Sequence, residues 1–160
     1  MAESFTIRRA RPEDAGQVAG QIALHRCLMF AEIRDYPPDS LAAMQAKYQG
    51  WVAERMQRGE YVAWFAVNEA GEIVGSAGVW LREWPISPRN LSGRDAYVLD
   101  VYVQPGYRGR GIGRTLMETL VEWCEQQCLV TITLEASDAG RPLYDRLGFE
   151  AMDMMRKRLV

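Results

Sequence analysis

The stretch from residue 96 to residue 114, AYVLDVYVQPGYRGRGIGR, decides how the rest of the chain is interpreted. Residues 96–103 are aliphatic, β-branched or aromatic except for Asp100, which predicts a strand buried on both faces. Gln104-Pro105-Gly106 ends that strand. Glycines then recur at 109, 111 and 113, before a segment in which apolar residues repeat every four positions to about Gln127. The sequence therefore predicts a strand, a tight turn and a helix in direct succession.

Positive charge gathers in that turn. Arg108, Arg110 and Arg114 stand between Asp100 and Glu118 with no acidic residue among them, although the whole chain has a net charge of −2. Glycines let the backbone approach a ligand closely, and the first turn of a helix offers unpaired N–H groups and a partial positive charge. Such a turn fits an anion, and a phosphate above all. The alternative is an ordinary tight turn whose arginines are solvated.

Two common phosphate-binding motifs do not match this turn. A Walker A loop ends in Gly-Lys-Ser or Gly-Lys-Thr, whereas Gly111 is followed by Ile112. A dinucleotide fingerprint needs G-x-G-x-x-G and an acidic ribose partner about twenty residues later, and the spacing here is G-x-G-x-G. The sequence therefore argues against an ATP or GTP loop and gives little support to a dinucleotide site.

The rest of the chain alternates between strand-like and helical patterns without repeats. Strands are predicted at 5–9, 61–67, 72–81, 96–103 and 129–134 and from Phe149 onward, and helices at 12–33, 42–56, 112–127 and 138–147. Asp39 or Ser40 is the expected cap of the second helix, residues 68–71 a hairpin turn, and 84–93 the longest loop. This order predicts a mixed-sheet α/β or α+β fold in one domain, residues 1–160.

Composition excludes several classes of protein. With 48% hydrophobic residues, 25% charged residues and a net charge of −2, the chain suits one globular core and lacks the basic excess of a nucleic-acid or anionic-membrane binder. The apolar runs are too short for a membrane span, and residues 1–11 lack the apolar segment of a signal peptide, so a cytoplasmic location is expected.

The cysteines and the histidine argue against metal and triad chemistry. Cys27, Cys124 and Cys128 are too few for a disulfide framework, and the last two, four residues apart, are expected to be buried on the helix. The single histidine, His25, has no partner at a metal-ligand spacing. A zinc hydrolase or a Ser-His-Asp hydrolase is therefore disfavoured, and no metal site is predicted.

Two motifs resemble those of the GCN5-related N-acetyltransferase (GNAT) superfamily. RGRGIG at 108–113 satisfies Q/R-x-x-G-x-G/A, the acyl-CoA pyrophosphate loop of that family, and LYDRLGF at 143–149 is similar to its L-Y-x-x-x-G-F segment. The Asn and Ala that are common seven and four residues before the tyrosine are replaced by Ser137 and Gly140. The resemblance implies a mixed, mostly antiparallel, twisted sheet of six or seven strands with about four flanking helices, and an acyl-CoA site where the central strands splay.

The same resemblance implies an activity: transfer of an acetyl group from acetyl-CoA to a primary amine of a small molecule or protein, by direct attack with both substrates bound. Tyr144 matches the tyrosine that hydrogen-bonds or protonates the departing sulfur, and packing is its alternative role. The other implied contacts to acetyl-CoA are Val101, Tyr102, Val103, Arg108, Gly109, Arg110, Gly111, Ile112, Gly113, Arg114, Ser137 and Arg141, the last of which has helix capping as an alternative.

A protonated amine must lose a proton before it attacks, and the sequence leaves the base open. An amine with a pKa of about 10.4 is almost entirely protonated at pH 7. Asp100 is the foremost candidate because it is a lone carboxylate in an apolar strand, and Glu135, another carboxylate or water are the alternatives. Glu32 and Asp35 are candidates for contact with a cationic acceptor.

The acceptor itself is not predicted from these residues, because loops set specificity without a simple code. A non-catalytic acyl-CoA-binding module on the same fold is the alternative function. A homodimer is expected only from its general frequency.

Overall fold

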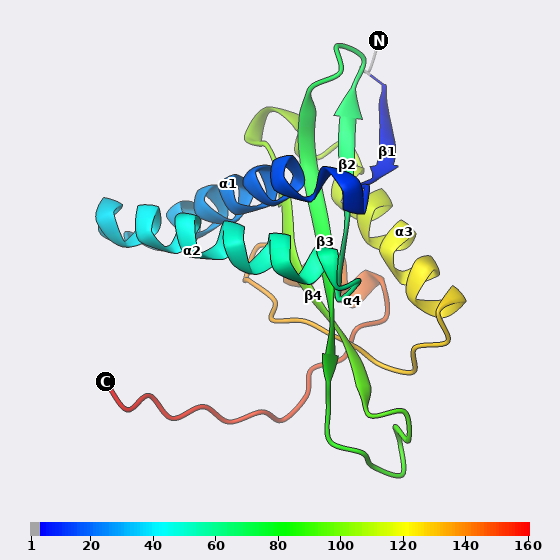
Figure 1. Cartoon of the computed structure of the whole chain (residues 1–160). Coiled ribbons are helices and arrows are strands. Elements are labelled where there is room, and N and C mark those ends of the chain that lie inside the picture. The colour runs from blue at the N-terminus through cyan, green and yellow to red at the C-terminus, as the bar shows by residue number, and fades with distance from the viewer. Residues whose placement is uncertain (1–3) are drawn as a thin grey trace.

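The computed structural model describes residues 4–160, so residues 1–3 of the predicted domain lie outside it. Its centre is a five-stranded sheet in the order β1-β2-β3-β4-β5. The strands are β1 (Phe5–Arg9), β2 (Tyr61–Asn68), β3 (Ile73–Glu83), β4 (Arg94–Val103) and β5 (Ile132–Thr133). The first four pair antiparallel, and β5 runs parallel to β4, so the sheet is mixed and mostly antiparallel, as predicted (Figure 1).

Four helices flank this sheet. The helices α1 (Ala15–Ile33) and α2 (Pro38–Gln57) cross one face, and α3 (Ile112–Gln126) covers the other (Figure 1). The short α4 (Arg141–Arg146) follows β5, and two 3-10 turns, Pro12–Asp14 and Pro105–Tyr107, precede α1 and the glycine-rich turn. Within residues 4–160, no helix is both long enough and apolar enough to cross a bilayer.

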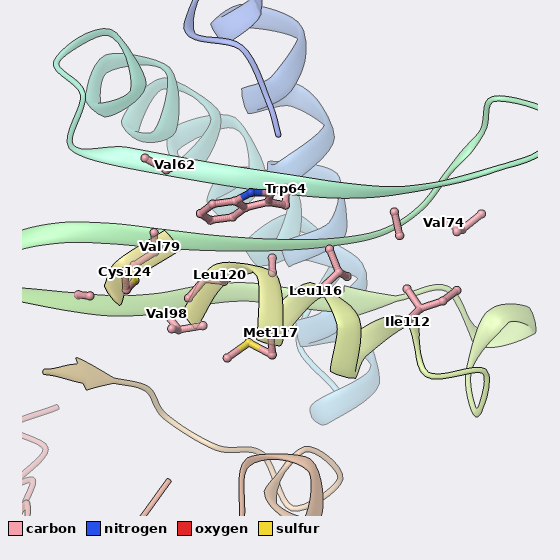
Figure 2. Packing of buried hydrophobic residues seen from close by; sticks show 13 residues of the cluster. Val62, Trp64, Val74, Val79, Val98, Ile112, Leu116, Met117, Leu120 and Cys124 are labelled. Carbon is pink, nitrogen blue, oxygen red and sulfur yellow. The ribbon is translucent and has the colours of Figure 1, made fainter. Parts of the chain in front are cut away.

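Strand β2 explains why the sheet is covered on both sides. All eight of its residues are buried, because alternate side chains enter two separate cores. Trp64 and its neighbours on one face pack against the α3 stripe of Ile112, Leu116, Leu120 and Cys124 (Figure 2). The other face packs against α1 and α2. The four-residue spacing in α3 thus forms the interface that the sequence predicts.

The sheet has five strands rather than six or seven, and the prediction of a closing strand from Phe149 is wrong. Residues 149–160 form no helix or strand, and those from Glu150 onward are exposed. Strand β5 has two residues rather than the six predicted for 129–134, and it pairs with β4 at Ala96–Ile132 and Tyr97–Thr133. So short a strand leaves little edge for a further strand to join.

Three predictions at element ends are corrected. Helix α2 begins at Pro38 rather than Ala42, without a side-chain cap from Asp39 or Ser40, because proline suits the first position of a helix. Helix α3 ends at Gln126, so Cys128 lies beyond it with φ 57° and is exposed, whereas Cys124 is buried as predicted. Helix α4 spans Arg141–Arg146 rather than 138–147.

Strand β4 is irregular at its centre. Leu99 lies opposite Gly78 and Tyr102 opposite Ser76, so Asp100 and Val101 together face Ala77 alone. Asp100 has φ 61°, the left-handed conformation that residues other than glycine rarely adopt. This β-bulge turns the second half of the strand, and the candidate site begins there.

Candidate active site

One pocket of about 620 Å³ lies between the end of β4, the glycine-rich turn, the C-terminal end of α1 and the start of α4. It gathers segments that are far apart in the sequence. The residues predicted to bind acetyl-CoA that line it are Val101, Tyr102, Val103, Arg108, Gly109, Gly111, Ile112, Gly113, Arg114, Ser137 and Tyr144. Arg110 and Arg141 were also predicted and are not part of its lining, nor is Asp100.

Two glycines of the turn at residues 108–113 have a left-handed conformation, and neither is crowded. Gly109 has φ 75° and Gly111 has φ 82°, and an added Cβ at either position would meet nothing within 4 Å. Gly111 is the N-cap of α3 and has no side-chain cap. The N–H groups of residues 112–114 therefore stand at an uncapped helix start on the pocket wall, where an anion is favoured.

Each arginine of the turn already has a protein partner. Arg108 donates from Nε to the Val103 carbonyl at 2.8 Å, and its guanidinium lies 2.6 Å from Glu32. Arg110 donates to the Gly106 carbonyl at 3.0 Å, and Arg114 pairs with Glu118 at 2.7 Å. Exposed ion pairs of this kind stabilise by about 0–1 kcal/mol, so a diphosphate is able to compete for these groups.

The pocket is open along the second half of β4. Because β5 pairs with β4 only at residues 96 and 97, the strands separate before Val101, Tyr102 and Val103, all of which line the pocket. Extended backbone without a neighbouring strand presents N–H and C=O groups that a linear amide-containing ligand is able to pair with. The splay thus lies where the resemblance implies it.

Tyr144 enters the pocket from α4. Its ring packs edge-to-face on Phe149, with centroids 5.8 Å apart. Gly140 leaves room for the Tyr144 ring, because a Cβ at residue 140 would lie 3.0 Å from it. The Gly140 amide donates a hydrogen bond to Ser137 Oγ at 3.1 Å. Burial raises the pKa of the Tyr144 phenol. The hydroxyl therefore stays protonated at neutral pH and is available as a hydrogen-bond donor.

Asp100 points away from the pocket lining, toward α1 and α2. Its buried carboxylate accepts hydrogen bonds from Arg26 at 2.9 Å and from the hydroxyls of Tyr48 and Tyr61 at 2.6 Å each. Burial and the nearby Asp100 charge raise the pKa of both phenols, so both remain donors. A base must reach the amine, whereas this carboxylate is enclosed by its three donors. The role of Asp100 as the base stays a prediction.

The other acidic candidates have different settings. Glu32 lines the pocket and is held by Arg108, with the Tyr102 hydroxyl 3.3 Å away. Glu135 is exposed and pairs with Arg156 at 2.5 Å, and Asp35 is exposed on the turn after α1. Glu32 is thus the carboxylate among these candidates that the pocket contains.

Sequence reasoning missed two sets of residues from other elements, besides six pocket residues that lie close in sequence to the predicted ones: Tyr107, Asp138, Ala139, Gly140, Leu143 and Arg146. Met29 and Ile33 reach the pocket because α1 crosses the sheet, a tertiary placement that no local pattern shows. Arg26, Tyr48 and Tyr61 surround Asp100 from three different elements. A signal for the second set did exist, because a lone carboxylate buried in an apolar strand needs donors from elsewhere in the fold.

Gly78 makes room for one of these donors, which leads to a stability prediction. A Cβ at residue 78 would lie 2.0 Å from the Tyr61 hydroxyl oxygen. Gly78→Ala is therefore expected to lower the free energy of unfolding by about 1–3 kcal/mol, the usual cost of overpacking. The measurement is chemical denaturation.

Gly50→Ala is the matched control, because residue 50 lies inside α2 with nothing within 4 Å of an added Cβ. It should raise the free energy of unfolding by about 0.5–1 kcal/mol, since alanine has the higher helix propensity. Equal stability of Gly78→Ala and the wild type would contradict the packing described here.

His25 leads to a prediction about pH. It is 1% exposed, its Nδ1 lies 2.7 Å from Ser76 Oγ, and burial lowers its pKa from 6.5 to about 4. Between these two pH values the unfolded chain binds a proton that the folded chain does not. The free energy of unfolding should therefore fall by about 3 kcal/mol as the pH drops from 6.5 to 4, on the basis of 1.36 kcal/mol per pKa unit.

The contribution of His25 is measured as the difference between the wild type and His25→Gln across that range. The variant lacks the titrating ring, so its free energy of unfolding should depend less steeply on pH. Parallel curves for the two proteins would contradict a neutral buried histidine.

The model of the Acetyltransferase (GNAT) family matches residues 23–149. The chain belongs to this family. The matched range contains every residue that lines the pocket, from Met29 to Arg146, so the GNAT match covers the whole candidate site.

Solved GNAT structures confirm the fold. A GCN5-related N-acetyltransferase of Ralstonia eutropha is 29% identical, with a TM-score of 0.86 over 98% of this chain and 99% of that one. A predicted acetyltransferase of Clostridium acetobutylicum, solved with acetyl-CoA, has a TM-score of 0.80 at 24% identity over 97% and 96% of the two chains. The GNAT fold inferred from the two motifs is thereby shown.

Curated GNAT relatives include enzymes with different acceptors. Streptothricin acetyltransferase of Streptomyces lavendulae is 30% identical over 91% of this chain and 82% of that protein. Glucosamine 6-phosphate N-acetyltransferase of Trypanosoma brucei brucei is 35% identical over 54% of this chain, and the match spans only 57% of that relative's own length. These names support an acyl-transferring enzyme and leave the acceptor open.

Proposed function

We propose that this GNAT protein transfers an acetyl group from acetyl-CoA to a primary amine, with both substrates bound at once. The supporting observation is the uncapped start of α3 behind two left-handed glycines, at one end of a pocket that also contains Tyr144. Bound acetyl-CoA supplies the reactive thioester carbonyl.

The pocket residues divide into two groups for holding acetyl-CoA. The N–H groups of residues 112–114, together with Arg108, bind the diphosphate, because helix starts and guanidinium groups favour phosphate oxygens. Backbone groups of Val101 and Val103 pair with the pantetheine arm along the open edge of β4. The ligand thereby runs from the glycine-rich turn toward Tyr144.

The chemistry needs one proton donor and one proton acceptor. Tyr144, which stays protonated, donates a hydrogen bond to the departing sulfur, and this bond strengthens as negative charge develops there. Water or a carboxylate takes a proton from the acceptor ammonium, and the resulting neutral amine attacks the thioester carbonyl as the C–S bond breaks. Asp100 takes this role only if its hydrogen bonds to Arg26, Tyr48 and Tyr61 loosen during the reaction.

The pocket favours a cationic acceptor. Glu32 lies on its wall at the C-terminal end of α1 and is half exposed, so the pocket offers a carboxylate to an ammonium group. Both small-molecule amines and protein amines satisfy this condition. A cytoplasmic location and a homodimer remain predictions.

Turnover tests the proposal. The purified chain is mixed with acetyl-CoA and a panel of primary amines, and free thiol is measured against time. Thiol release that depends on an amine is the expected result. CoA binding without release for any amine would favour the non-catalytic acyl-CoA-binding module instead.

Arg108→Ala is expected to raise the KM for acetyl-CoA about tenfold, because a charge-assisted hydrogen bond contributes about 1.5–3 kcal/mol. The effect should shrink at high salt, since the contact is electrostatic and half exposed. Arg58→Ala is the control, because Arg58 is another exposed arginine, which pairs with Glu54 at the end of α2. Equal KM values in all three proteins would rule out a phosphate contact by Arg108.

A further inference from the structure

We propose that Asp100 is a positioning residue, which holds the bulge of β4 in place and so sets the geometry of the strand that binds pantetheine. This inference rests on the proposed function, because it concerns how the same pocket is shaped. It differs from the role of base, since the carboxylate then acts through the backbone and never meets the amine.

The backbone conformation of Asp100 needs stabilising contacts from the surrounding structure. Its φ of 61° is unfavourable for any residue with a Cβ, although aspartate and asparagine tolerate it better than most. A strand that relaxed to regular geometry would lose the bulge. Such a conformation persists when the surrounding structure over-determines it.

Two polar networks stabilise this backbone conformation. The carboxylate accepts hydrogen bonds from Arg26 of α1, Tyr48 of α2 and Tyr61 of β2. The main-chain carbonyl of Asp100 accepts one from Ser76 Oγ at 3.1 Å, and Ser76 in turn lies 2.7 Å from His25 Nδ1. Both the side chain and the backbone of this residue are therefore tied to the helices across the sheet.

The part of β4 that Asp100 positions is the stretch directly after it. Val101, Tyr102 and Val103 line the pocket, and Val101 and Val103 pack with the α3 core, whereas Tyr102 lies beside His25 on the α1 face. Because strand side chains alternate, removal of one bulge residue would exchange these two faces. The bulge thus decides which groups of β4 meet the pocket.

The burial of Asp100 separates this role from that of a base. Its side chain is 0% exposed, whereas its partner Arg26 is 20% exposed. The carboxylate is therefore placed to orient the strand rather than to exchange protons with a ligand.

The same strand offers a matched control. Asp95 is also buried in β4, where it pairs with Arg82 at 2.7 Å and accepts from Thr133 at 3.1 Å, and it does not line the pocket. Asp95→Asn therefore removes a comparable buried ion pair from β4 without touching the bulge.

The test is calorimetric titration of coenzyme A itself into the wild type, Asp100→Asn, Tyr48→Phe and Asp95→Asn. Coenzyme A binding involves no proton transfer from an acceptor amine, so loss of a base leaves it unchanged. We expect Asp100→Asn and Tyr48→Phe to weaken binding at least fivefold, and Asp95→Asn to stay within twofold of the wild type. Asparagine suits the left-handed conformation, so the first variant removes the charge without added backbone strain.

Three results would overturn the inference alone. The first is wild-type affinity for coenzyme A in Asp100→Asn, and a lost rate with a lost acid limb of the pH–rate profile in that variant would make Asp100 the base instead. The second is coenzyme A binding that Asp95→Asn weakens as much as Asp100→Asn does. The third is wild-type affinity for coenzyme A in Tyr48→Phe. That variant keeps the Arg26–Asp100 pair, so it tests the inference if Asp100→Asn does not fold. A wild type that binds no coenzyme A would overturn the proposed function as well.

Discussion

Tyr144→Phe is expected to lower kcat by roughly 10-fold to 150-fold while leaving the affinity for coenzyme A within about twofold. The phenol lies in the pocket, and burial raises its pKa, so the wild type presents a donor to the sulfur as negative charge develops. A hydrogen bond to a charged group contributes about 1.5–3 kcal/mol, which corresponds to a rate factor of roughly 10 to 150. Steady-state kinetics with acetyl-CoA and the best amine of the panel give kcat, and calorimetry gives the affinity.

Tyr97→Phe is the matched control for that variant. Tyr97 is also a partly buried tyrosine whose phenol pKa is raised by burial, but it lies at the start of β4, outside the pocket. Its variant should keep the wild-type kcat. If the kcat of Tyr144→Phe equalled that of the wild type, Tyr144 would be a packing residue whose role is its contact with Phe149.

Gly111→Ala is expected to weaken coenzyme A binding by about fivefold to thirtyfold. Residue 111 has φ 82° and is the N-cap of α3, and a left-handed conformation costs a residue with a Cβ about 1–2 kcal/mol. The free loop relieves this strain by leaving the conformation that exposes the N–H groups of residues 112–114, so ligand binding must restore it. Titration of coenzyme A into the variant measures the loss.

Gly106→Ala is the control for the loop. Gly106 belongs to the 3-10 turn before the arginines, has no positive φ, and offers open space to a Cβ. Its affinity for coenzyme A should match the wild type. Similar losses in both glycine variants would show that the loop is merely sensitive to substitution, and that Gly111 has no special part in the site.

The glycine-rich turn, the strand before it and the helix after it were predictable because their signals are local. The spacing of Ile112, Leu116, Leu120 and Cys124 specifies the buried face of α3, and the left-handed Gly109 and Gly111 follow from the turn between two regular elements. The two family motifs then identified the fold. Most of the pocket lining follows from these few residues.

The remainder depends on tertiary contacts that local patterns do not contain. Met29 and Ile33 reach the pocket because α1 lies across the sheet, and Arg26, Tyr48 and Tyr61 converge on Asp100 from three elements. The segment after Phe149 was predicted to be a closing strand, but its residues from 150 to 158 include none that favour strands, and the two-residue β5 offers little edge to pair with. Element ends likewise shifted where proline or a left-handed residue intervened, at Pro38 and Cys128.

The Asp100 networks connect the two halves of the site. Helices α1 and α2 supply Arg26 and Tyr48, and α1 also supplies Glu32 on the wall proposed to meet the amine. Strand β4 continues from Asp100 into the residues proposed to bind pantetheine. The hydrogen bonds of Asp100 thus join the two walls of the pocket that we propose to bind the acceptor and the cofactor.

The central claim is that the turn between β4 and α3 binds a diphosphate, and calorimetric comparison of two ligands tests it most directly. Coenzyme A joins its pantetheine arm to 3′-phosphoadenosine through the diphosphate, whereas pantetheine is the arm alone, without the diphosphate or the nucleotide. We predict that coenzyme A binds one site per chain, at least a hundredfold more tightly than pantetheine, and that its affinity falls as salt rises because the contacts are charged. Equal affinities for the two ligands, or no heat from coenzyme A, would contradict the claim.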